Sequence, residues 1–149
     1  MRLFVLMCTG LFMTLSLHAA PAPVKTVETH QPFVGYIQKL KASISAHKMG
    51  IVAEACATCG AKKIGVKIAG NRVIMIFNPH FAVRMLKASI PAGVEAPLRL
   101  YVTENKDGTA QLSYQLPSDI FAPYENDALN GMALELDQIV DKIVKKSVK

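Results

Sequence analysis

The sequence predicts an α+β fold in which helices pack on one face of a mainly antiparallel sheet. Residues 98–104 and 110–116 alternate apolar and polar side chains, and the turn between them ends in Gly108, which is typical of a β-hairpin. Two long segments, following Pro32 and Asp127, carry apolar residues at helical spacing. A hairpin beside long amphipathic helices favours a sheet with its helices on one side.

The first half of the chain is expected to alternate between strands and helices. The predicted elements are a strand at 24–30, a helix from Phe33 that Gly50 caps, a strand at 51–55, a turn and short helix at 56–67, a turn at 69–71 and a strand at 72–77. The helix is predicted from one apolar stripe spaced by four, three and four positions: Phe33, Ile37, Leu40 and Ile44. Residues 72–77 are a continuous apolar run, which predicts a strand buried on both faces or nearly so.

The second half is expected to complete the sheet and close with a helix. The predicted elements are a short helix at 81–89, the two hairpin strands, an irregular link at 119–124 and a helix at 127–146. The last helix is predicted from its own apolar stripe: Leu129, Met132, Leu136, Ile139 and Ile143. Lysines at its carboxyl end suit the helix dipole.

Length and composition indicate one globular domain. The chain has 149 residues, of which 51% are apolar and 19% charged, with a formal net charge of +6. These values are typical of a folded domain with a sizeable core and exclude a disordered chain. The lysines are spread along the chain with few aromatic residues among them, so we expect no nucleic-acid partner.

The amino end has the pattern of a secretory signal peptide cleaved after Ala19. Arg2 precedes an uncharged apolar run at 3–17, which is shorter than the ~20 residues that span a bilayer. The predicted division is a signal peptide at 1–19, a flexible lead-in at 20–25 and a single domain at 26–146. Cleavage would remove Cys8 and leave two of the three cysteines in the periplasm or outside the cell, where disulfides persist.

Five short motifs follow one another in the domain: VIMIFNP at 73–79, PLRLYV at 97–102, DG at 107–108, LSY at 112–114 and Pro117. In this order and spacing they resemble the domain of unknown function 302 (DUF302) family, and the resemblance covers Thr26 to Val144. It implies a fold similar to the TATA-binding-protein-like class, with a β-α-β(n)-α arrangement. It implies no DNA binding, because function is argued from a site and not from a fold.

The family has no established activity, so the resemblance gives no catalytic residues. The chain also departs from the commoner family pattern after the second strand. A histidine often occurs there, whereas this chain has Cys56 and Cys59 in a C-x-x-C motif.

The Cys56/Cys59 pair is the clearest candidate for chemistry. Its spacing suits a short structural disulfide, a redox or regulatory disulfide, or part of a soft-metal site with Met49 or His80. No second C-x-x-C completes a structural zinc site, and Gly60 stands where a c-type haem needs histidine. The motif therefore leaves a structural bridge, thiol exchange, soft-metal transport and two free thiols open.

A second candidate is the polar face of the predicted hairpin. Arg99 and Tyr101 share one strand face, and His80 follows a buried strand, so these three residues are candidate ligand contacts. No motif of a hydrolase, phosphate loop or zinc protease occurs, and we expect neither a catalytic constellation nor a bound cofactor.

The sequence thus predicts a non-enzymatic module, periplasmic or secreted, that binds a small molecule or a periplasmic protein. The alternatives are a thiol-redox protein that uses Cys56 and Cys59, and a soft-metal carrier. An open sheet edge would also allow a homodimer.

Overall fold

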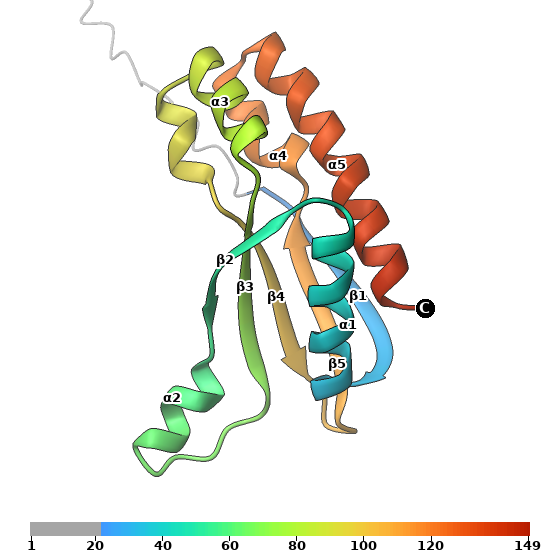
Figure 1. The fold of residues 1–149 in the computed structure, drawn as a ribbon. Coiled ribbons are helices and arrows are strands. Elements are labelled where there is room, and N and C mark those ends of the chain that lie inside the picture. Colours follow the sequence, from blue (N-terminus) through green and yellow to red (C-terminus); the bar gives the residue numbers. More distant parts are fainter. Residues whose placement is uncertain (1–21) are drawn as a thin grey trace, which may run out of the picture.

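The computed structural model describes residues 22–149, and Figure 1 shows the fold. Its strands are β1 (Val24–Pro32), β2 (Gly50–Ala55), β3 (Asn71–Phe77), β4 (Leu98–Glu104) and β5 (Thr109–Gln115). Its helices are α1 (Phe33–Ala46), α2 (Ala57–Lys63), α3 (Pro79–Ala88), α4 (Pro117–Phe121) and α5 (Asp127–Ser147), with 3₁₀ turns at Pro91–Glu95 and Ala122–Tyr124.

The five strands form one sheet in the order β1-β5-β4-β3-β2, and every neighbouring pair is antiparallel. The predicted hairpin is present as β4 and β5, with Thr103 opposite Gln111. The amino-terminal strand and β2 form the two edges. The predicted α+β fold with a mainly antiparallel sheet is confirmed.

The core lies between the sheet and the helices on one of its faces. Figure 1 shows α1 and α5 side by side across that face. Alternate residues of the central strands point into the core: Ile74, Ile76, Leu100, Val102, Ala110, Leu112 and Tyr114. The predicted stripe of α1 is buried in full, and four of the five predicted stripe residues of α5 are buried, with Ile139 partly exposed.

Two predictions are wrong: one concerns the cap of α1, and the other concerns the burial of residues 72–77. Gly50 does not cap α1, because the helix ends at Ala46 and Lys48 takes the left-handed conformation with φ of 58°. Gly50 instead begins β2. The run at 72–77 is not buried on both faces, because helices cover only one side and the opposite residues of β3 stay partly exposed.

The link at 119–124 is also more regular than predicted. Pro117 occupies the first turn of α4, where its missing N–H costs nothing, so it starts a helix as well as ending a strand. Phe121 closes α4 with its ring in the core, 2% exposed. The burial of that ring explains why the segment folds back against α5.

The predicted signal peptide and its cleavage after Ala19 lie outside the described residues. Strand β1 begins at Val24, so the last two residues of the predicted lead-in at 20–25 belong to the sheet. Among residues 22–149 no helix is both long enough and apolar enough to cross a membrane.

One part of the chain stands apart from the two layers. We call residues 56–69 the arm: it comprises α2 and the loop that returns from α2 to β3. Figure 1 shows α2 at the end of the sheet opposite α3 and α4. Helix α2 has no buried residue, and the side chains of Ile64, Val66 and Ile68 are 77%, 49% and 42% exposed.

Candidate functional site: an exposed disulfide on the arm

Cys56 and Cys59 form a disulfide at the start of the arm, with their Cα atoms 5.2 Å apart. Cys56 is the residue that precedes α2, and Cys59 lies in the first turn of the helix. Cys56 is partly exposed and Cys59 is exposed. The disulfide therefore lies at the surface of the protein, and Cys59 is the more exposed of its two residues.

The bridge connects two residues of one short segment and no two distant elements. The chain-entropy model gives a loop this short about 2 kcal/mol of stabilisation, well below that of a bridge across a domain. The sheet and its covering helices are held by their own buried core. The disulfide is therefore not needed to hold the two layers together.

Hydrogen bonds fix the position of the bridge within the arm. The backbone N–H of Cys59 donates to Cys56 Sγ at 3.0 Å. The Thr58 hydroxyl donates to the Ala69 carbonyl at 3.0 Å and accepts from the Asn71 N–H at 2.9 Å, which ties α2 to the start of β3. An N–H donor already directed at Cys56 Sγ would stabilise a thiolate on that sulfur.

The arm is positively charged. Lys62, Lys63 and Lys67 are exposed, and residues 55–70 contain no aspartate or glutamate. None of the ion pairs formed within residues 22–149 uses these three lysines. Because Lys62 and Lys63 follow Cys59 by three and four positions, they lie on the same side of α2 as its sulfur.

An ion-pair cluster anchors the base of the arm to the helical layer. Glu54, two residues before the disulfide, bonds both to Lys41 of α1 and to Arg72 of β3. Partial burial acts to raise the pKa of Glu54, but the bonds from the two cations outweigh it and lower that pKa below its usual value. The end of β2 that leads to Cys56 is thus bonded both to α1 and to β3.

The open face of the sheet carries the predicted Arg99 and Tyr101. Both are exposed on the side away from the helices and line a shallow hollow of about 270 Å³, together with residues of β1 and β5. The Tyr101 hydroxyl accepts a hydrogen bond from the Asn71 side chain, and the Thr26 and Ser113 hydroxyls bond to each other. Several polar groups of this face therefore satisfy one another.

The structure does not bring His80 to either of these sites. It is exposed in the first turn of α3, in the helical layer, and its N–H donates to Asn78 Oδ1 at 2.9 Å. Met49 is buried at the opposite end of β2 from Cys56, about 20 Å along the strand at 3.3 Å per residue. The ligand set suggested for a soft metal is thus divided between the two ends of β2.

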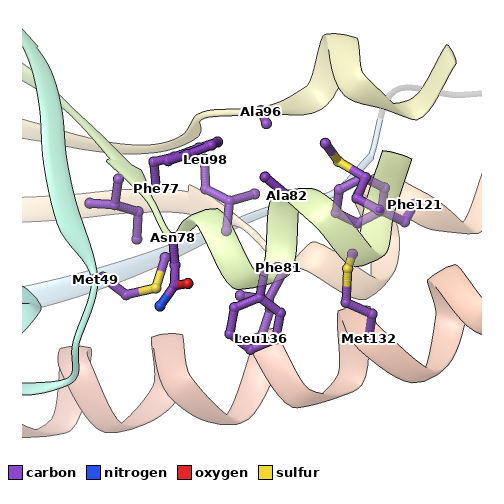
Figure 2. A pocket seen from close by; sticks show the side chains of 12 residues that line it. Met49, Phe77, Asn78, Phe81, Ala82, Ala96, Leu98, Phe121, Met132 and Leu136 are labelled. Atoms are coloured by element: carbon purple, nitrogen blue, oxygen red, sulfur yellow. The ribbon is translucent and has the colours of Figure 1, made fainter. Parts of the chain in front are cut away.

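A cavity that the sequence did not suggest lies between α3, α5 and the end of the sheet. Figure 2 shows Phe81, Ala82, Phe121, Met132 and Leu136 among the side chains around it. Its volume is about 30 Å³, far below the ~300 Å³ of small-molecule pockets, and its lining is almost wholly apolar. It is a packing void of the core and not a ligand site.

The exposed arm was only partly visible in the sequence. The C-x-x-C spacing pointed to the disulfide, and the i+3 and i+4 spacing could have placed the lysines beside Cys59. The isoleucines and valine of the arm favoured a buried segment instead of an exposed one, because such residues are usually buried.

Comparisons with known proteins place the chain in a family but give it no activity. The model of the family described as "Domain of unknown function DUF302" matches residues 25–147. The crystal structure of an uncharacterised conserved DUF302 protein from Bacillus stearothermophilus is similar, with a TM-score of 0.74 and 18% identity over 83% of this chain and 97% of that one. No curated protein matches. The chain belongs to the DUF302 family.

Proposed function

We propose that the protein exchanges thiols and disulfides with reduced polypeptides through the Cys56–Cys59 bond. The observation that carries this proposal is an accessible disulfide on an arm that contributes little to the core. A bridge in such a position is free to open and close without unfolding the domain. We place the protein in the periplasm or outside the cell, because an oxidising compartment keeps the bond formed.

The exchange is a two-electron transfer in two steps. A thiolate of the reduced polypeptide attacks Cys59 Sγ, a bond forms between those sulfurs, and the electron pair of the Cys56–Cys59 bond passes to Cys56 Sγ, which takes a proton. A second thiolate of the polypeptide attacks its own sulfur in this mixed disulfide and releases Cys59, which also takes a proton. The polypeptide loses two electrons and two protons, and Cys56 and Cys59 gain them.

A second candidate function is small-ligand binding on the open face of the sheet. The hollow beside Arg99 and Tyr101 favours it, since an exposed arginine beside an aromatic ring can hold a small anion. We rank it second because the hollow is shallow and its polar groups are partly paired with one another.

Incubation of the oxidised protein with a reduced two-cysteine peptide tests the first proposal. We expect one equivalent of peptide to become oxidised while Cys56 and Cys59 become thiols, as measured by intact mass after alkylation. Protein that has been reduced and alkylated beforehand should oxidise none. The proposal is wrong if the bond persists under conditions that fully reduce a linear oxidised peptide with the sequence of residues 54–63.

A further inference from the structure

A hollow of about 500 Å³ lies between α2 and the return loop of the arm. It is lined by Thr58 and Lys62 of α2 and by Gly65, Val66, Lys67 and Ile68 of the loop. Two ammonium groups and two apolar side chains thus surround one depression. We call these six residues the arm hollow.

The arm hollow lies next to the disulfide. Thr58 and Lys62 are one helical turn apart and so share the face of α2 that lines it. At 100° per residue, Cys59 falls between Lys62 and Lys63 around the helix, on the border of that face. Neither cysteine lines the hollow, but Thr58, which does, lies between Cys56 and Cys59 in the sequence, so the disulfide borders the hollow.

The charge of the arm is positive, and positive charge attracts anions. From residue 55 to residue 70 the chain has three lysines and no carboxylate, so all the side-chain charge of the arm is positive. The lysines form no ion pair with any side chain of residues 22–149, so a carboxylate that docks there displaces no existing partner. A second copy of this arm would bring like charges together, which disfavours self-association through this surface.

We propose that the arm hollow binds anionic thiols and so sets which thiols react with the disulfide. The carboxylate lies between Lys62 and Lys67, and the carbon chain lies on Val66 and Ile68. The thiolate reaches Cys59. The ligand is either a small carboxylate-bearing thiol or an acidic cysteine-containing segment of a polypeptide, and both present the same chemistry. This inference rests on the exchange reaction proposed above.

Small thiols of different charge test it. Rate constants for reduction of the oxidised protein, expressed per thiolate, are compared for 3-mercaptopropionate, 2-mercaptoethanol and cysteamine at low salt. The Lys62→Gln/Lys67→Gln variant is expected to slow the anionic thiol about tenfold, the lower end of electrostatic steering effects, and to leave the neutral thiol nearly unchanged. In 1 M salt, where the screening length is about 3 Å, the difference should largely disappear.

The matched control is Lys142→Gln/Lys146→Gln, which removes the same charge from exposed positions of α5. It should leave all three rates unchanged. A cysteine peptide with flanking glutamates, compared with one with flanking glutamines, separates the polypeptide source from the small thiol. If the arm variant slows all three thiols equally, slows none of them, or matches the α5 control, the arm hollow does not select anions.

The two proposals fail in distinguishable ways. If the bond persists with every thiol under conditions that fully reduce the linear 54–63 disulfide peptide, the exchange function itself fails. If reduction is fast but independent of the charge of the thiol and of Lys62 and Lys67, only the assignment of the arm hollow fails.

Discussion

A Cys56→Ser variant is expected to form a stable mixed disulfide at Cys59 when it meets the disulfide dimer of a single-cysteine peptide. Cys59 is the more exposed of the two cysteines, and without Cys56 no neighbouring thiol can resolve the product. The same variant should lose all capacity to oxidise a two-cysteine peptide, because it has no disulfide to accept two electrons. Intact mass spectrometry measures both outcomes.

The Cys59→Ser variant is the matched control for that result. It retains the partly buried Cys56, so we expect its mixed disulfide to form more slowly, on the order of tenfold, since exchange rates depend on access. With both rates expressed per thiolate, equal rates for the two variants, or a faster Cys59→Ser, would show that Cys59 is not the sulfur that partners attack.

Replacing Gly70 by alanine is expected to cost about 2–3 kcal/mol of unfolding free energy, in the upper part of the range for an overpacked site. Gly70 is buried where the arm returns to the sheet, and an added Cβ would lie 2.7 Å from the Phe33 ring and 2.9 Å from Glu104 Cβ. Its N–H also donates to the Glu104 carboxylate at 2.6 Å. The strand and the start of α1 would have to move apart.

The control for this variant is Gly131→Ala in α5. No heavy atom lies within 4 Å of a Cβ added there, so the change should stabilise the protein by about 1 kcal/mol through helix propensity. Urea unfolding of both variants measures the two changes in unfolding free energy, which should have opposite signs. A Gly70→Ala protein as stable as the natural chain would refute the close packing of the arm's return against Phe33.

The sequence predicted the layers of this fold well, because the signals that define them are local. Alternation at 98–104 and the turn before Thr109 located β4 and the start of β5 to within a residue. The stripe that begins at Phe33 located the buried face of α1. Each of these patterns keeps one period over several residues. Tertiary contacts did not change the secondary structure that the patterns predict.

The parts that could not be predicted depend on what lies opposite a residue in space. An apolar run such as 72–77 does not reveal that helices cover only one face of β3. The need for glycine at position 70 comes from Phe33 and Glu104, which are distant in sequence. The exposed Ile64 and Ile68 run against the usual tendency of such residues to be buried, so the sequence contained no local signal for an open arm.

Whether the arm disulfide exchanges with thiols is decided by the reduction potential of the Cys56–Cys59 pair. The protein is equilibrated with glutathione buffers of known potential, and the fractions of disulfide and dithiol are measured by alkylation and mass spectrometry. An exchange role predicts a potential in the range of thiol-exchange proteins, about −270 to −120 mV. A value below about −300 mV, which is typical of structural bridges, would contradict it.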